Sequence, residues 1–422
     1  MNHTPTIVRP LVSPAEYQTY FHMADQAFSR PPSEEGERRW QGYTSHMPGF
    51  HTEQMRGAFR NDQQLGGYMM FDRVMRMGAA RISTGCIGAV VTANEHRRQG
   101  VASALMHDAI DFARQRGHAL LMLDGIPKFY YRYGYTDIYD VSSLEVDRAA
   151  ILAHKPRPYH IRAATPDDAG AVLALHNRCY ANYTGSFERS LEKQTFYLRE
   201  GWQKGIVAQA ENGRIEGYLY IHLEERARAR EVAAIDWHSL HTLLYYHATQ
   251  FDEHDAPTTL HYILSPDSPL AYWMIDHLEV LDTSQWDGAV LEGVVHGKSY
   301  HHRHAAWMAR IVHLPTLMAA LLPELQERWR RALAYWQGEV IFTVGDEAFG
   351  LRIHDRTVQL VDVASATSAH VTLSPQQFVE VIFGYRPLSY FVHTHALESE
   401  LGNVLALLFP TGHTWISVTD WF

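Results

Sequence analysis

The sequence predicts a mixed α/β protein built from several domains, and three observations support this prediction. The chain has 422 residues, which at about 100–200 residues per domain suggests two to four domains. Apolar residues make up 46% and charged residues 20%, as in ordinary globular proteins, so disordered and fibrous classes are excluded. A buried strand, an amphipathic helix and a second strand follow one another between residues 81 and 123, which predicts a βαβ unit with parallel strands.

Charge, cysteines and hydropathy exclude several function classes. The net charge of −10 argues against nonspecific nucleic-acid binding. Cys86 and Cys179 are far apart and have no metal-like spacing, so we expect neither a disulfide framework nor a structural zinc site. No apolar run approaches about 18 residues, and the N-terminus lacks the pattern of a secretory signal. We therefore expect a cytoplasmic protein without a membrane segment.

The first block of the chain extends to a proline-containing linker at residues 154–159. Residues 81–92 are apolar and β-branched and predict a buried strand. The helix that follows has its apolar face at Val101, Leu105, Ala109 and neighbouring positions, and Gly117 ends it. Residues 119–123 predict the next strand.

The second and third blocks alternate strands and helices in the same way. In the second, Thr165 and Pro166 begin a helix, residues 205–210, 217–223 and 232–236 predict strands, and residues 238–251 predict a helix. This order resembles the first block and suggests an internal duplication. In the third we expect a strand at 307–312, a helix at 315–336 interrupted by Pro323, a hairpin at 339–354, strands at 356–363 and 371–373, and a helix from Ser374-Pro375 to Gly384. The predicted domains are residues 1–155, 156–302 and 303–422.

The sharpest motif is a loop between the strand at 81–92 and the helix after it. Its residues are Arg97, Arg98, Gln99, Gly100, Val101, Ala102 and Ser103. Unpaired N–H groups and the helix dipole make such a helix start a phosphate site, and small residues let a pyrophosphate approach the backbone. The loop matches neither GxxxxGK[ST] nor GxGxxG. An ordinary turn with a solvated arginine pair is the alternative interpretation.

This loop and a second motif resemble those of the GCN5-related N-acetyltransferases (GNAT). The loop reads Arg97-x-x-Gly100-x-Ala102, and one strand later the chain reads Phe129-Tyr130-Tyr131-Arg132-Tyr133-Gly134-Tyr135, with Pro127 placed to begin a short helix. The resemblance implies that acetyl-CoA binds, with pantetheine along Val90, Val91 and Thr92 and the pyrophosphate on the amides of Arg98 to Ser103. It implies that Tyr130 is the general acid that protonates the departing thiolate; the alternative is a packing role for Tyr130. Family members often have valine and proline where this chain has Thr92 and Asn94.

The whole chain resembles the enhanced-intracellular-survival acetyltransferases. These join two tandem GNAT-like domains to a sterol-carrier-protein-like domain, and the fold class expected here is the same. In the second block, residues 237–241 contain neither the glycine nor the arginine pair of the loop, so no acetyl-CoA should bind there. The resemblance implies that the carboxylate of Phe422 acts as general base and that the protein is a homo-oligomer, a ring such as a hexamer. The alternative for residues 409–422 is a last sheet strand with no catalytic part.

The resulting hypothesis is an acetyl-CoA-dependent N-acetyltransferase that acts by direct attack of a primary amine. By resemblance, its acceptor is an aminoglycoside, a polyamine or a lysine-like amine. The rival hypothesis is a lipid carrier or scaffold whose first domain only senses coenzyme A. The chain has 27 histidines, densest at residues 300–304 and 238–241, with a further His-x-His pair at His393 and His395. None of these groups has a metal-site pattern, and we expect no metal.

Overall fold

The chain folds as two compact units in the computed structural model, and neither unit is continuous in sequence. The structure describes residues 5–29, 31–126, 128–139, 141–157, 159–200, 203–252, 254–278, 297–302, 307–363, 369–392 and 399–422. The first unit takes in the described residues up to Tyr139, those from Trp307 to Gly412, and Phe422. The second takes in the described residues between 141 and 302, and residues 413–421.

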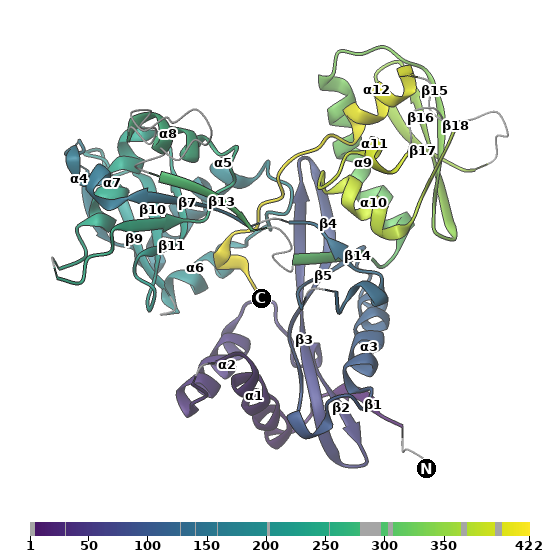
Figure 1. Cartoon of the computed structure of the whole chain (residues 1–422), viewed down its shortest axis with the longest axis horizontal. Coiled ribbons are helices and arrows are strands. Elements are labelled where there is room, and N and C mark those ends of the chain that lie inside the picture. The colour runs from purple at the N-terminus through teal and green to yellow at the C-terminus, as the bar shows by residue number, and fades with distance from the viewer. Residues whose placement is uncertain are drawn as a thin grey trace, which may run out of the picture. The chain divides into compact units, whose positions relative to one another are not determined.

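The first unit is organised around a seven-stranded mixed sheet in the order β1-β2-β3-β4-β5-β14-β6. Its strands are β1 (Ile7–Pro10), β2 (Met55–Arg60), β3 (Gln63–Met77), β4 (Ala80–Thr92), β5 (Leu120–Asp124), β14 (Trp307–Ile311) and β6 (Thr136–Asp137). Helix α1 (Pro14–Phe28), with α2 (Glu34–His46) packed on it, covers one face, and α3 (Val101–Gln115) covers the other (Figure 1). Strands β4 and β5 are parallel, so the βαβ prediction is confirmed.

The second unit contains a sheet with the same spatial order, β8-β9-β10-β11-β12-β7-β13. Its elements are β8 (His160–Ala163), α5 (Ala169–Tyr180), α6 (Leu191–Arg199), β9 (Gln203–Gln209), β10 (Ile215–His222), β11 (Arg228–Ala234), α7 (Trp237–Ala248), β12 (Thr259–Tyr262), α8 (Pro269–His277), β7 (Val141–Asp147), α4 (Arg148–Ala153) and β13 (Gly297–His302). Strands β11 and β12 are parallel, as β4 and β5 are. The predicted strands and helix of the second block are all present, with ends moved by a few residues.

The sixth strand of each sheet comes from an unexpected part of the chain. β7 follows β6 in sequence but pairs with β12 and β13 of the second sheet. β14 follows β13 but pairs with β5 and β6 of the first sheet, with Trp307 opposite Asp124 and Ile311 opposite Leu120. The assignment of residues 307–312 to the C-terminal domain is therefore wrong. The physical reason is that residues 120–123 of β5 are apolar and buried, so both edges of this strand need a partner, and β14 supplies the second.

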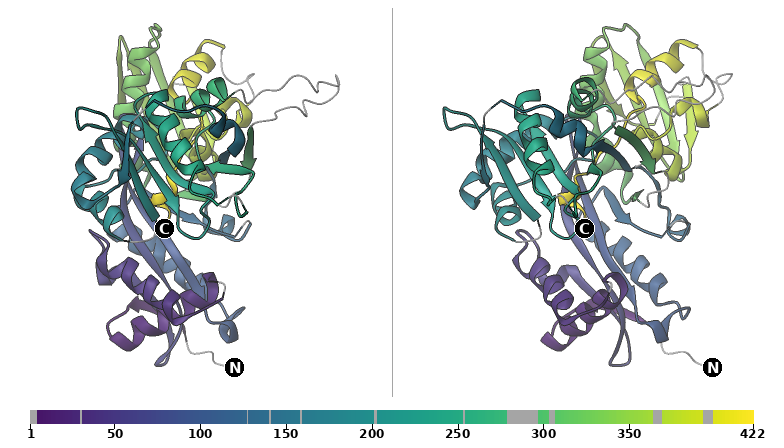
Figure 2. Two further views of the ribbon diagram at one scale, coloured as in Figure 1. Left: turned by 90° about the vertical axis from the view of Figure 1, so that its left-hand side faces the viewer. Right: turned by 60° about the vertical axis from the view of Figure 1, so that its left-hand side comes forward.

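The rest of the first unit is a four-stranded sheet, β17-β16-β15-β18, with helices against it. The elements are α9 (Leu314–Arg331), β15 (Gly338–Val344), β16 (Glu347–His354), β17 (Thr357–Val361), β18 (Ala369–Leu373), α10 (Pro375–Ile382), α11 (Leu388–Phe391) and α12 (Ser399–Leu408). The hairpin prediction is confirmed, since Val344 pairs with Glu347 across a two-residue turn. The predicted interruption at Pro323 is wrong, because α9 continues through it; its buried face, from Leu314 to Trp329, keeps the helix packed on both sides of the proline. Figure 2 shows these helices and strands from two further sides.

The C-terminal segment forms no strand among its described residues, so the alternative of a last sheet strand is wrong. Residues 410–417 are irregular, and a short 3-10 turn follows at Val418–Asp420. No helix in the described part of the chain has the length and apolar character needed to cross a bilayer.

Candidate active site

Strands β4 and β5 separate at one end of the first sheet and leave an open backbone edge. Their parallel pairing ends at Ile87 opposite Leu123, whereas β4 continues to Thr92. The other edge of β4 stays paired with β3, where Gly67 faces Val91. The β5-facing edge of Val90, Val91 and Thr92 therefore has no strand partner among the described residues. An extended amide-containing ligand can add to such an edge as a further strand.

A bulge in β4 explains this separation. Between the pairs Gly67–Val91 and Met69–Gly88, β4 contributes one residue more than β3. Ala89 takes a φ of 45° within this extra length, and the hydroxyl of Tyr20 donates to its carbonyl at 2.9 Å. Bulges bend the strand that carries them, so β4 turns away from β5 just beyond Ile87.

The loop after β4 ends in a helix start whose N–H groups have no side-chain partner. Gly100 is the N-cap of α3, with a φ of 83° and no capping side chain. The first bond of the helix runs from the Ala104 N–H to the Gly100 carbonyl at 3.0 Å, so the amides of Val101, Ala102 and Ser103 have no partner within the helix. Arg98 also has a positive φ, of 62°. Consecutive amides in such a turn, with the helix dipole behind them, form a site for phosphate.

The side chains of the loop differ in whether they hydrogen-bond to other parts of the described chain. The side chains of Arg97 and Arg98 are exposed and make no hydrogen bond or ion pair with a described residue. The Gln99 side chain is occupied, since it accepts from Arg60 at 2.9 Å and donates to the Glu95 carbonyl at 3.0 Å. A Cβ on Gly100 would meet nothing within 4 Å. The positive φ of Gly100 favours glycine at this position, and the room that it would leave for a pyrophosphate stays a prediction.

The aromatic motif forms a tight turn beyond β5. The described part contains a 3-10 turn at Tyr131–Tyr133, ended by Gly134 with a φ of 84°; Pro127, expected to begin this helix, lies outside the described residues. Ser103 of α3 and Tyr133 share a hydrogen bond of 2.7 Å between their hydroxyls. The start of α3 and the aromatic turn are thereby held together.

Tyr130 is a buried phenol in this turn. It packs edge-on against Phe129 with ring centroids 4.9 Å apart, and a Cβ on Gly125 would lie 2.3 Å from its ring. Burial, and then the negative charge of Asp124, raise the pKa of Tyr130 to about 12. The phenol is therefore protonated at neutral pH and can act as a proton donor.

Phe422 lies in the first unit, beside β4. A Cβ on Gly88 would be 3.1 Å from the carboxyl carbon of Phe422. The Phe422 ring packs edge-on against Trp307 of β14, with centroids 5.1 Å apart. Its carboxyl group therefore lies over β4, one residue beyond the last pair between β4 and β5.

One residue at this place was missed in the sequence analysis. Asp124 is the last residue of β5, at the point of separation, and burial raises the pKa of its carboxyl to about 6. The only sequence signal was its position, an acidic residue directly between an apolar strand and Gly125.

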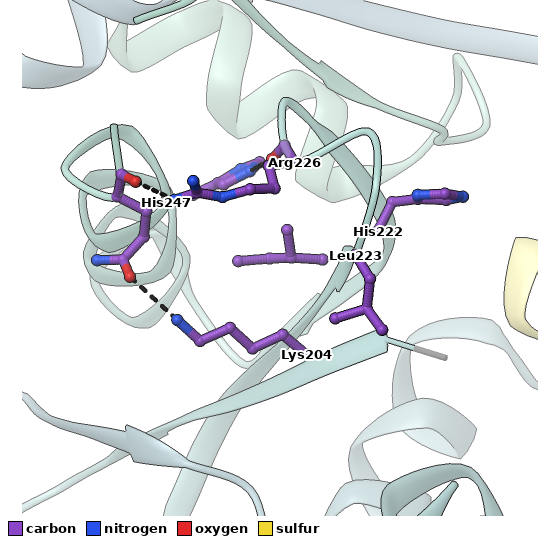
Figure 3. Close-up of a pocket in the computed structure, with 7 residues that line it drawn as sticks. Lys204, His222, Leu223, Arg226 and His247 are labelled. Carbon is purple, nitrogen blue, oxygen red and sulfur yellow. Dashed lines mark hydrogen bonds between the residues drawn. The ribbon is translucent and has the colours of Figure 1, made fainter. Parts of the chain in front are cut away.

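A cavity in the second unit and the histidine groups are further candidates for a ligand or metal site. A cavity of about 80 Å³ in the second unit is lined by Lys204, His222, Arg226 and neighbours (Figure 3). Its cations are already bonded, since Arg226 donates to the Gln250 carbonyl and Lys204 to the Gln250 side chain. Among the described residues no three His, Cys, Asp or Glu side chains gather as a metal site would require. His304, His393 and His395 lie outside the described residues.

Comparison with known proteins agrees with this geometry. Residues 8–138 match the family described as an acetyltransferase (GNAT) domain. An uncharacterized N-acetyltransferase of Streptomyces coelicolor is 28% identical over 142 residues, a match that spans 32% of this chain and 32% of that relative. A GCN5-related N-acetyltransferase structure from Kribbella flavida aligns with a TM-score of 0.72 at 18% identity, covering 99% of this chain and 100% of the other. Eis1 from Mycobacterium abscessus aligns with a TM-score of 0.62 at 16% identity and the same coverage.

The two structural neighbours show the fold of the whole chain. The family match concerns its first part only, residues 8–138. The matched residues contain β4, the phosphate-type loop, α3 and the aromatic turn. The first unit of this protein thus contains, in residues 8–138, an acetyltransferase domain of the GNAT family.

Proposed function

We propose that this protein is an N-acetyltransferase that moves an acetyl group from acetyl-CoA to a primary amine of a cationic small molecule, aminoglycoside- or polyamine-like, or to lysine. The observation that carries the proposal is the meeting of three features in the first unit. These are the free edge of β4, the uncapped start of α3, and two groups near the separation of β4 and β5: the buried phenol of Tyr130 beyond β5 and the carboxyl group of Phe422 beside β4.

The donor would be held mainly by backbone groups. The amides of Val101, Ala102 and Ser103 would bind the pyrophosphate, with Arg97 and Arg98 able to reach further phosphate oxygens. The free edge of Val90 to Thr92 would pair with the pantetheine arm. The side chains of Val91 and Val101 are buried in the core, so these two residues contribute through their main chain.

The chemistry supplied by the donor is a thioester open to attack by a neutral amine. The amine nitrogen would attack the thioester carbonyl carbon, and the carboxylate of Phe422 would accept the proton that this nitrogen loses as the amide bond forms and the carbon–sulfur bond breaks; the proton then passes to solvent. Tyr130 donates its proton to the departing sulfur, and the phenolate is reprotonated from solvent. No covalent enzyme intermediate is required, and Cys86 is buried on β4 as a core residue.

We propose a second, inactive copy of the acetyltransferase fold in the second unit. The shared order of strands, and the parallel pair at the same position of each sheet, support a duplication. The helix equivalent to α3 is α7, and its start is blocked, because the Asp236 side chain accepts from the Ser239 N–H at 2.8 Å. A carboxylate at that position occupies the amides and repels phosphate.

The rival hypothesis of a lipid carrier concerns the four-stranded sheet and its helices, for which we propose a sterol-carrier-protein-like fold. The interior of this part holds a cluster of four phenylalanine rings. Phe342 stacks on Phe349 with centroids 5.0 Å apart, and Phe378 and Phe409 complete the cluster. A core filled in this way favours a structural role over lipid transport.

We also propose that the enzyme is a homo-oligomer and that it is located in the cytoplasm.

A substitution at Tyr130 tests the general acid. We expect Tyr130→Phe to lower kcat by about 10²–10⁴-fold and to leave acetyl-CoA binding intact, as followed by thiol release and calorimetry. Tyr131→Phe is the matched control, because it removes a phenol from the same turn that is bonded to Asp137 at 2.8 Å. Equal loss of activity in both variants would contradict a catalytic role for Tyr130.

An extension tests the carboxyl group of Phe422. A few glycine and serine residues added after Phe422 remove the carboxylate from its place beside Gly88, so turnover with every amine of a primary-amine panel should fall while acetyl-CoA still binds. Unchanged turnover would remove the proposed base and keep the enzyme. Absence of turnover in the unmodified protein, together with retention of a fatty ligand, would favour the lipid carrier.

A further inference from the structure

Asp124 lies on the same face of the first sheet as the carboxyl group of Phe422. Side chains alternate between faces along a strand, and Leu121 and Leu123 of β5 belong to the core cluster beneath α3. Asp124 therefore points to the opposite face. Ile87 of β4 belongs to the same cluster, so the neighbouring Gly88, beside which Phe422 lies, also faces away from α3.

The partner strand gives an independent indication of this placement. Asp124 is directly opposite Trp307 in the antiparallel pair of β5 and β14, and opposite residues share a face. The Trp307 ring contacts the Phe422 ring. Asp124, Trp307 and Phe422 are therefore neighbours on one face, at the end of the sheet where β4 and β5 separate.

The Asp124 carboxylate has no partner among the described residues. It makes no hydrogen bond or ion pair with a described residue, and its negative charge adds to burial in raising the pKa of the Tyr130 phenol. Asp124 is exposed to solvent, and the protein that surrounds part of its side chain raises the pKa of the carboxyl to about 6. A carboxylate that is partly desolvated and unpaired is unfavourable by itself and is stabilised when a cation binds beside it.

We propose that Asp124 is a specificity-determining residue of the acceptor site, which binds a cationic nitrogen of the acceptor other than the nitrogen that is acetylated. The inference rests on the proposed function, in which the Phe422 carboxylate serves the reacting nitrogen. Neighbouring strands are about 5 Å apart, and more where they separate, so the two nitrogens of a suitable acceptor would be about 5–10 Å apart. Short diamines meet this requirement, and monoamines of the same length lack the second cation.

The test compares 1,4-diaminobutane with butylamine as acceptors in the intact protein. We expect Asp124→Asn, which keeps the shape of the side chain, to lower kcat/KM for the diamine by about 10–100-fold through KM. It should leave the KM for butylamine and the KM for acetyl-CoA unchanged. Asp124→Glu should restore part of the preference for the diamine. Asp111→Asn is the matched control, because Asp111 is an exposed acidic residue of the same unit, on α3, paired only with Arg114.

Binding separates this inference from the proposed function. Calorimetry of 1,4-diaminobutane with the Tyr130→Phe protein, with and without Asp124→Asn, measures acceptor binding without turnover. Weaker diamine binding after Asp124→Asn supports the inference even if no amine is acetylated. An unchanged diamine-to-monoamine ratio, together with unchanged diamine binding, overturns it.

Discussion

Gly88 illustrates how a single hydrogen atom in place of a methyl group makes room at the candidate site. A Cβ there would lie 3.1 Å from the Phe422 carboxyl carbon and 3.1 Å from the Phe71 ring. We expect Gly88→Ala to displace the carboxyl group and lower kcat by at least about tenfold, with acetyl-CoA binding unchanged by calorimetry. Gly402→Ala is the control: its Cβ would meet nothing within 4 Å, and in helix α12 it should raise stability by about 0.5–1 kcal/mol. Full activity of Gly88→Ala would contradict the placement of Phe422.

The negative charge of Asp72, on β3, should contribute to folding stability and not to catalysis. Although partial burial opposes its ionisation, hydrogen bonds from His118 and Arg116 lower its pKa to about 2. A depressed pKa stabilises the folded state above the unfolded value of about 3.9, and this contribution disappears as pH falls from about 4 to 2. Asp72→Asn should therefore cost about 1–2 kcal/mol at pH 7 and nothing near pH 2, as measured by urea unfolding at both pH values. An equal cost at both would show that packing, not charge, is responsible.

At the scale of elements, the segment 413–421 is held in the second unit by a buried charge network. Asp420 accepts from Arg189 at 2.8 Å and from the Tyr197 hydroxyl at 2.9 Å, and Arg189 also donates to Glu231 at 2.6 Å. Trp415 stacks on Tyr180 with ring centroids 4.0 Å apart. These residues precede Phe422 in sequence by only a few positions. The network and the stacked rings together anchor residues 413–421 in the second unit.

Arg189→Met tests how much this network contributes to the stability of the fold. The change leaves the carboxylates of Glu231 and Asp420 buried without their main partner, at a cost of about 3–5 kcal/mol. We expect a lower unfolding midpoint and faster digestion of the C-terminus by carboxypeptidase. Arg199→Met is the control, because Arg199 forms an exposed pair with Glu200 and such pairs contribute about 0–1 kcal/mol. Equal behaviour of the two variants would show that the segment is anchored by its aromatic contacts.

At the scale of the whole molecule, the exchange of β7 and β14 makes each sheet depend on distant sequence. A fragment of residues 1–155 would contain the complete GNAT match but would lack β14. The edge of β5 would be left open, and the buried Trp307, Met308 and Ala309 would be missing from the core. We expect this fragment to aggregate. Residues 1–139 joined through a flexible linker to residues 307–312 should be more soluble, as judged by soluble yield and thermal unfolding. A stable 1–155 fragment would show that β14 is dispensable.

Most of the candidate donor site could be predicted from sequence because its signals are local. The loop from Arg97 to Ser103, the helix after it and the aromatic turn each depend on neighbouring residues, and the structure has the predicted strand–loop–helix–strand order. The occupied side chain of Gln99 could not be predicted, since it depends on Arg60 from another strand. Asp124 was missed for a similar reason: an acidic residue after an apolar strand has no distinctive spacing.

By itself the sequence determined the class of fold, the positions of most strands and helices, and the GNAT character of its first part. It could do so because hydrophobic periodicity, helix caps and the loop motif each depend on residues that are only a few positions apart. The tertiary structure alone decided which strands pair in each sheet and that α9 continues through Pro323. It also decided that Phe422, Trp307 and Asp124 are neighbours. These outcomes depend on contacts between residues up to about three hundred positions apart, which form when apolar strands such as β5 bury both edges.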